Sequence, residues 1–254
     1  HPVEFMAATM NLDIHLTDKL NTFVQECRRM EVPVEPPCVN RSRAKFTVEG
    51  GRILYALGAL KNVGLEAMRL IVEAREAGGP FADLVDLARR VDLKAVGKRA
   101  LEMLARAGAF DAIEPNRARA FAALDRLVEF SAAAQADRAS GQAGLFGEAE
   151  ALPPPRLPGV EDWAPNARLA EEQAAVGFYL SGHPLDDYEG ALRRKGVMSH
   201  AEFLAARART GGRGRIAGTL TGMQNRKSAR GTRFAYLQLS DRTGGYEVMA
   251  FSDV

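Results

Sequence analysis

Two stretches decide the fold of the larger part of this chain: Leu57-Gly58-Ala59-Leu60-Lys61-Asn62-Val63-Gly64 and Leu93-Lys94-Ala95-Val96-Gly97-Lys98-Arg99. Each leads from a helical run through a tight turn into a second helix, and Asn and Gly tolerate the positive φ of such a turn. The first backbone N–H groups of the second helix have no partner inside it, and with the helix dipole they attract a phosphate. We therefore predict two helix–hairpin–helix units.

Positive charge surrounds the second hairpin. Between Asp86 and Arg106 six Lys or Arg residues face three acids, for a local net charge of +3. Cations beside a phosphate seat favour contact with a nucleic-acid backbone, without readout of its bases. The alternative is a pair of ordinary helical hairpins packed together. The residues that we predict to bind duplex DNA are Lys61, Asn62, Val63, Gly64, Lys94, Ala95, Gly97, Lys98 and Arg99.

Helical periodicity dominates the first half of the chain. Thr17 is expected to cap the helix that follows it. A β-hairpin is expected around Glu49-Gly50-Gly51. Further helices are predicted over residues 64–77, 80–90, 97–107, 116–137 and 167–180, the last ended by Ser181-Gly182-His183-Pro184, in which His183 is a turn residue.

A Gly- and Pro-rich segment, residues 138–166, interrupts the helices and is predicted to be a flexible linker. It contains Gln142-Ala143-Gly144-Leu145-Phe146, which has the form of a short peptide ligand. Leu145 and Phe146 would fill an apolar pocket of a partner, and Gln142 would hydrogen-bond at its rim. The alternative is that this peptide packs back onto its own domain.

Strand alternation replaces helical periodicity near the end of the chain. Strands are expected over residues 215–222, 234–239 and 246–251, separated by Gly-containing turns, which suggests part of a small β-barrel. From Arg193 to Arg233 there are eleven Lys or Arg residues and one acid. Basic loops beside aromatic side chains suit single-stranded nucleic acid, and a solvated basic face is the alternative. The predicted contacts are Arg226, Lys227, Arg230, Arg233, Phe234 and Tyr236.

Composition bounds the function. The chain has 254 residues, 46% hydrophobic and 26% charged, with a net charge of +2, so one or two globular domains are expected and any electrostatic argument must be local. Cys27 and Cys38 are the two cysteines, which excludes a disulfide scaffold and favours a reducing compartment. No apolar run is long enough for a membrane span. Neither end has the pattern of a natural terminus, and we expect part of a longer polypeptide.

Catalytic signatures are absent from the sequence. It has no P-loop, no GxGxxG motif, no metal-ligand spacing among its four His and two Cys residues, and no strand-flanked carboxylate pair for two Mg²⁺ ions. We therefore predict no catalytic and no metal-binding residue in this chain.

Several motifs occur in one order along the whole sequence. They are Pro2-Val3-Glu4-Phe5-Met6-Ala7-Ala8, Asp18-Lys19, Glu26-Cys27-Arg28-Arg29-Met30, Pro36-Pro37-Cys38-Val39-Asn40, Tyr55 to Lys61, Gly108-Ala109-Phe110-Asp111, Gln142 to Phe146, Gly177 to Leu185, and Leu239 to Gly244. In this combination they resemble the bacterial DNA polymerase III alpha subunits, a family of C-family replicative polymerases.

The resemblance implies a mainly α fold with a small β part, and a role for each segment. Residues 1–55 correspond to the distal fingers, 56–137 to a tandem helix-hairpin-helix domain that holds duplex DNA, 138–166 to a linker with the clamp-binding peptide, 167–210 to a helical connector, and 211–254 to the start of an OB domain. The full-length protein would be a cytoplasmic DNA-directed DNA polymerase that uses Mg²⁺. Its partners would be duplex and single-stranded DNA, the sliding clamp and other replicase subunits. The catalytic carboxylates would lie upstream, leaving this piece inactive alone.

Two residues depart from the family pattern. Asn62 stands where the first hairpin commonly has Gly, and Gly144 stands where the clamp peptide often has Asp. The main alternative function is a free-standing helix-hairpin-helix plus OB module for nucleic-acid binding or repair. A helical scaffold with no nucleic-acid role is a third possibility, but it leaves the basic C-terminal stretch unexplained.

Overall fold

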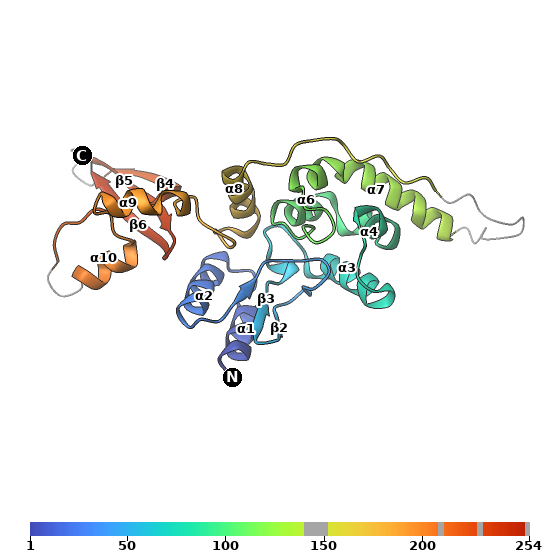
Figure 1. Cartoon of the computed structure of the whole chain (residues 1–254), viewed down its shortest axis with the longest axis horizontal. Coiled ribbons are helices and arrows are strands. Elements are labelled where there is room, and N and C mark those ends of the chain that lie inside the picture. The colour runs from blue at the N-terminus through green and yellow to red at the C-terminus, as the bar shows by residue number, and fades with distance from the viewer. Residues whose placement is uncertain (140–151, 208–210, 228–230, 252–254) are drawn as a thin grey trace, which may run out of the picture. The chain divides into compact units, whose positions relative to one another are not determined.

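The computed structural model describes residues 1–139, 152–207, 211–227 and 231–251, and the chain divides into two units at Leu180 (Figure 1). The described residues form helices and two small three-stranded sheets, which confirms the predicted mainly α fold with a small β part. The first unit contains α1 (Pro2–Leu12), α2 (Thr17–Arg29), β1 (Val34–Glu35), β2 (Thr47–Glu49), β3 (Arg52–Leu54), the 3₁₀ turn η1 (Leu57–Ala59), α3 (Leu65–Gly78), α4 (Leu84–Arg90), α5 (Leu93–Val96), α6 (Lys98–Arg106), α7 (Arg117–Ala139) and α8 (Pro165–Val176).

A short sheet precedes the first hairpin. β2 and β3 pair antiparallel across Gly50 and Gly51, both with positive φ, so the predicted β-hairpin is confirmed. β1 adds to β3 in parallel, with Val34 opposite Ile53. The chain then enters the core at Tyr55, whose buried ring contacts Phe46 edge-on at 5.1 Å between ring centroids.

Three helix boundaries differ from the predictions. The helix α2 begins at Thr17 itself, with Leu16 as N-cap and no side-chain cap from the described residues. The helix predicted at 80–90 begins only at Leu84, because the Asp83 carboxylate accepts a hydrogen bond from the Asp86 N–H and caps it there. The last predicted helix of this unit ends at Val176, because Gly177 adopts φ +103° and terminates it.

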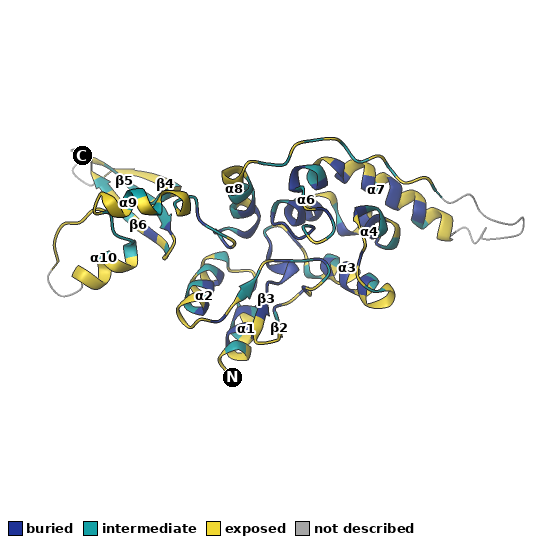
Figure 2. Cartoon of the chain, in the orientation of Figure 1, coloured by how far each residue is buried: buried dark blue, intermediate teal, exposed yellow. Residues whose placement is uncertain are grey.

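The helices α3 to α8 share one apolar core. Figure 2 shows the buried residues on the inward sides of α3, α4, α6 and α7. Leu57, Ile71, Leu101 and Leu104 are each fully buried in it. Gly58 permits a close approach between two backbone segments, since a Cβ there would lie 2.7 Å from the backbone oxygen of Ala44.

The segment 152–164 has no regular secondary structure but lies along α7. The Asn116 side chain donates to the Val160 carbonyl at 2.8 Å, and the Trp163 ring lies 5.9 Å from the ring of Phe121. Arg126 donates to the Arg156 carbonyl at 2.7 Å. This half of the predicted flexible linker is therefore held in place. Gln142, Leu145 and Phe146 lie outside the described residues.

The end of α8 packs against the beginning of the chain. The Ala175 carbonyl accepts a hydrogen bond from the Lys61 N–H at 2.8 Å, and Arg28 of α2 donates to the Leu180 carbonyl at 2.8 Å. Gly177 is required here on steric grounds as well, because a Cβ would lie 2.1 Å from the Thr17 methyl group. The end of α8 and the residues that follow it thus connect α2 with the first hairpin.

The second unit is smaller. Its elements are η2 (Asp186–Tyr188), α9 (Glu189–Arg194), α10 (His200–Arg207), β4 (Thr219–Lys227), β5 (Arg233–Asp241) and β6 (Gly244–Phe251). The strands form an antiparallel sheet in the order β4-β5-β6, and they confirm that the alternating stretches are strands. β4 begins later and runs further than expected, because its ladder with β5 continues to the pair of Lys227 and Arg233. His183 is buried, and its ring bonds the Ser240 hydroxyl and the Leu185 N–H, so it has a structural role in its turn.

Candidate nucleic-acid interface

The second hairpin presents an uncapped helix end with exposed cations. Gly97 joins α5 to α6 with φ +88° and ψ +135°, and no described side chain caps the N-terminus of α6. Lys94, Lys98 and Arg99 are exposed around it. Within the described residues, Lys94 and Arg99 have no ion pair. Free N–H groups at a helix N-terminus and unpaired cations are features that attract an anion.

Asp92 limits what this hairpin can offer. Its carboxylate accepts hydrogen bonds from the N–H groups of Lys94 and Ala95 at 3.0 and 3.1 Å, and so caps α5. The predicted contacts at Lys94 and Ala95 therefore cannot come from these two N–H groups. The Lys94 ammonium is still available, and the first turn of α6 is the part open to a phosphate.

The first hairpin has a different environment. Its leading helix is only the single turn η1, and Asn62 supplies the positive φ of the hairpin at +59°. Gly64 is the N-cap of α3 and has ordinary extended backbone angles, φ −87° and ψ +141°. The Val63 side chain is buried in the core, so only the backbone of this residue is available for a contact with DNA. Lys61 is half-buried, and its N–H already bonds α8, so Asn62 and Gly64 are the exposed positions.

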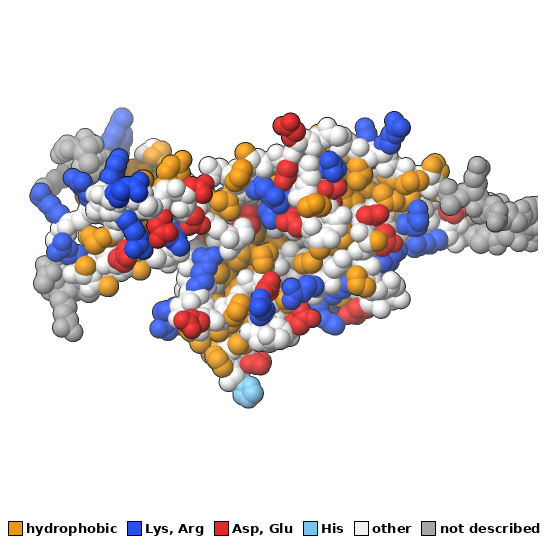
Figure 3. Space-filling model, in the orientation of Figure 1, with side chains coloured by type: hydrophobic (Ala, Val, Ile, Leu, Met, Phe, Trp, Pro, Cys, Tyr) orange, Lys and Arg blue, Asp and Glu red, His pale blue; other side chains and the backbone are white. Residues whose placement is uncertain are grey.

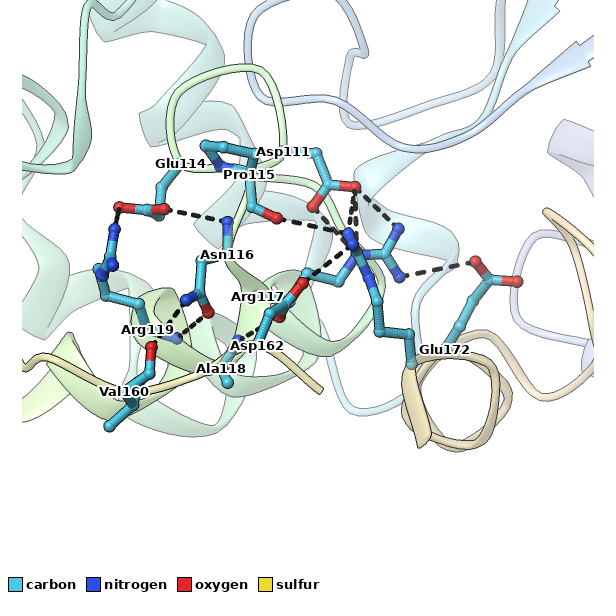
Figure 4. Close-up of polar contacts among 11 residues, drawn as sticks. Asp111, Glu114, Pro115, Asn116, Arg117, Ala118, Arg119, Val160, Asp162 and Glu172 are labelled. Carbon is cyan, nitrogen blue, oxygen red and sulfur yellow. Dashed lines mark hydrogen bonds and ion pairs between the residues drawn. The ribbon is translucent and has the colours of Figure 1, made fainter. Parts of the chain in front are cut away.

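A polar cluster fixes the segment between α6 and α7 (Figure 4). Arg117, with 10% of its side chain exposed, donates to both carboxylate oxygens of Asp111 and lies 3.8 Å from a carboxylate oxygen of Glu172. Arg168 of α8 adds contacts to Asp111 at 3.4 Å and to Asp162 at 3.0 Å. Because these residues come from three separate segments, the cluster ties α8 to the base of the helices that carry the second hairpin.

In the second unit, three of the predicted single-strand contacts, Arg226, Phe234 and Tyr236, share one face of the sheet, whereas Lys227 and Arg233 pair with each other on the other face. Phe234 and Tyr236 lie edge to face with ring centroids 5.5 Å apart, and Phe251 lies 6.1 Å from Phe234. Arg226 is directly opposite Phe234 in the ladder. A hollow of about 530 Å³ is lined by Arg226, Lys227, Arg233, Phe234 and Phe251 together with Asn225, Ala235 and Ala250. Arg230 lies outside the described residues.

Positively charged side chains are concentrated on the second unit. Figure 3 shows Lys and Arg side chains crowded over the second unit on the face in view. Arg226 and Lys227 are the last residues of β4, and Arg233 is the first residue of β5. The ladder places Arg226 beside the ring of Phe234.

Within the described ranges, no three His, Cys, Asp or Glu side chains are arranged so that they could hold a metal ion. In the same residues, no helix has both the length and the apolar character needed to cross a membrane.

Known proteins match the sequence of both units. Residues 31–120 match a family model described as a helix-hairpin-helix motif. The DNA polymerase III subunit alpha of Caulobacter vibrioides is 49% identical over 98% of this chain, and that of Thermus aquaticus is 40% identical over 99%. The chain belongs to the DNA polymerase III alpha subunit family. It spans 22% and 20% of the length of these two relatives.

The match to DNA polymerase III alpha subunits confirms the resemblance and the helix–hairpin–helix prediction. Sequence reasoning missed three features of the site. They are the Asp92 cap, the contact between α8 and the first hairpin, and an ion pair of 2.6 Å between the Lys98 Nζ and the Asp125 carboxylate of α7. Asp92 directly before an apolar helical run was a readable cap signal. Asp125 and Ala175 had no such signal in the sequence, because each lies far along the chain from its partner, Lys98 and Lys61 respectively.

The two hairpin glycines should respond differently to alanine. Neither Cβ would meet a described atom within 4 Å, so only backbone conformation differs. Gly64→Ala should change the free energy of unfolding little, whereas Gly97→Ala should cost about 1–3 kcal/mol more, because φ +88° is essentially restricted to glycine. Urea unfolding followed by the fluorescence of Trp163, the single tryptophan, measures both. Equal midpoints for the two variants would contradict the different roles.

Proposed function

We propose that this chain holds the DNA during synthesis by a replicative DNA-directed DNA polymerase. The observation that carries the proposal is the uncapped N-terminus of α6 flanked by exposed Lys98 and Arg99. Family membership supports it, because the relatives named DNA polymerase III subunit alpha match almost the whole chain. A free-standing repair module has no comparable support among these relatives.

The proposed contact is with the phosphate backbone. Backbone N–H groups and flexible cations recognise phosphate oxygens and carry no information about base sequence. A polymerase must hold every sequence that it copies, so this mode suits the task. The whole enzyme would require Mg²⁺ and carboxylates that lie outside this chain, and would act in the cytoplasm with other replicase subunits.

Removing the two cations of α6 should weaken duplex binding in a salt-dependent way. For the full chain with a short duplex, Lys98→Ala/Arg99→Ala should reduce the log–log salt slope by about 0.9 for each phosphate that the variant no longer neutralises. The measurement is fluorescence anisotropy over a range of salt concentrations.

The matched control removes two exposed cations from α2, Lys19→Ala/Arg29→Ala, and should leave the slope unchanged. An unchanged slope in the Lys98/Arg99 variant itself would refute the assignment of α6.

We further propose that the aromatic face of the second unit, as the start of an OB domain, contacts single-stranded template. The support is the juxtaposition of Phe234 and Tyr236 with Arg226 in adjacent strands. Phosphates would meet the cations while bases stack on the rings.

Truncation of the two rings should lower single-strand affinity. Each stacked base is worth about 1–3 kcal/mol, so Phe234→Ala/Tyr236→Ala should weaken oligonucleotide binding by at least about 5-fold. The control, Leu220→Ala/Met223→Ala, removes two exposed apolar side chains from the opposite sheet face and should have no such effect. Similar reductions in both variants would argue for a general disturbance of the sheet.

We also propose that Gln142, Leu145 and Phe146 bind the sliding clamp. Burial of the Leu and Phe side chains is worth about 1.5–3 kcal/mol each. Ordering of the peptide offsets part of this, so a micromolar-range contact is expected. A clamp that encircles the same DNA raises the effective concentration and makes such a contact sufficient.

Removal of the two anchors should separate processive from distributive synthesis. Leu145→Ala/Phe146→Ala in the full-length enzyme should abolish clamp binding and processive extension, yet leave extension of a short primed template nearly intact. Surface plasmon resonance with immobilised clamp and primer-extension assays measure the two effects. Wild-type clamp affinity in the variant would refute the peptide assignment.

A further inference from the structure

Lys98 already has an anionic partner in the absence of DNA. It is the first residue of α6, and its Nζ lies 2.6 Å from Oδ1 of Asp125 in α7, the helix against which α6 packs (Figure 1). Both side chains are largely exposed, at 55% and 70%. The hydrogen bond from Lys98 to Asp125 raises the pKa of Lys98, and Glu102 one turn along α6 adds a weaker attraction. Lys98 is therefore a protonated group whose ammonium is paired with the Asp125 carboxylate.

The pairing is selective among the cations of this hairpin. Within the described residues Lys94 and Arg99 make no ion pair. Lys98, which directly follows the N-cap residue Gly97, does make one. The Asp125 carboxylate therefore occupies the Lys98 ammonium at the start of α6, where a phosphate would bind. A phosphate that binds at this turn must replace the Asp125 carboxylate before it can pair with Lys98.

We propose that Asp125 competes with DNA phosphate for Lys98 and thereby sets how tightly the second hairpin holds the duplex. This inference rests on the proposed duplex binding. An exposed ion pair is weak, so the competition lowers affinity by a small factor and does not block binding. A weakened grip suits a surface over which the duplex must move during synthesis.

The test is Asp125→Asn in the full chain, because Asn keeps the shape of the side chain and removes its charge. Duplex affinity should rise about 2- to 5-fold at low salt, and the gain should shrink as salt screens the pair. The matched control is Glu129→Gln, the same charge change one turn along α7, at a residue with no ion pair to the hairpin in the part of the chain that the structure describes. The control should raise affinity clearly less.

A double-mutant cycle separates competition from general repulsion. In the Lys98→Ala background, Asp125→Asn should no longer raise affinity. A gain that persists there, an equal gain from Glu129→Gln, or no gain at all would overturn the proposal. Failure of the proposed function gives a different result, namely no salt-dependent weakening on Lys98→Ala/Arg99→Ala. Thermal unfolding of each variant confirms that the fold is intact.

Discussion

The first unit depends on the requirement that a buried cation be paired. Arg117 is nearly enclosed, and desolvating an arginine is costly unless carboxylates and hydrogen bonds compensate. Asp111, which precedes α7, and Glu172, which lies in α8, provide that compensation. Gly108 leaves space for the guanidinium, because a Cβ there would lie 2.2 Å from it. Because Arg117 pairs with both acids, the position of α8 is fixed relative to Asp111 and to the start of α7. The helices that carry the second hairpin are thereby held in place.

That arrangement separates the tasks of the two hairpins. The first hairpin commits the Lys61 N–H to α8 and the Val63 side chain to the core, so it serves mainly as an internal joint. The second hairpin has a glycine turn with positive φ, an uncapped helix and exposed cations. Two copies of one local motif therefore acquire different roles from their surroundings.

The sequence predicted local features well and long-range contacts poorly. Both hairpins, the Gly50-Gly51 turn and the presence of three C-terminal strands follow from glycine positions and apolar periodicity, which act over a few residues. The cap at Asp83 and the helix end at Gly177 could have been predicted by the same local rules. The predicted helices were too long because the apolar pattern continues beyond these two residues. The pairing of Lys98 with Asp125, the burial of Val63 and the path of residues 152–164 along α7 depend on tertiary packing, which periodicity does not encode. The extent of β4 was underestimated because exposed strands have weak alternation.

The contact between Arg28 and the Leu180 carbonyl spans 152 residues of sequence. A ribosome adds about 5–20 residues per second, so α2 waits about 8–30 s after its own synthesis for this partner. During that interval the ring of Tyr55 lacks Phe178, its later neighbour at 6.4 Å. Folding of the first unit is thus completed by the segment that follows α8, and until then the nascent chain leaves the apolar side chains that this segment covers exposed.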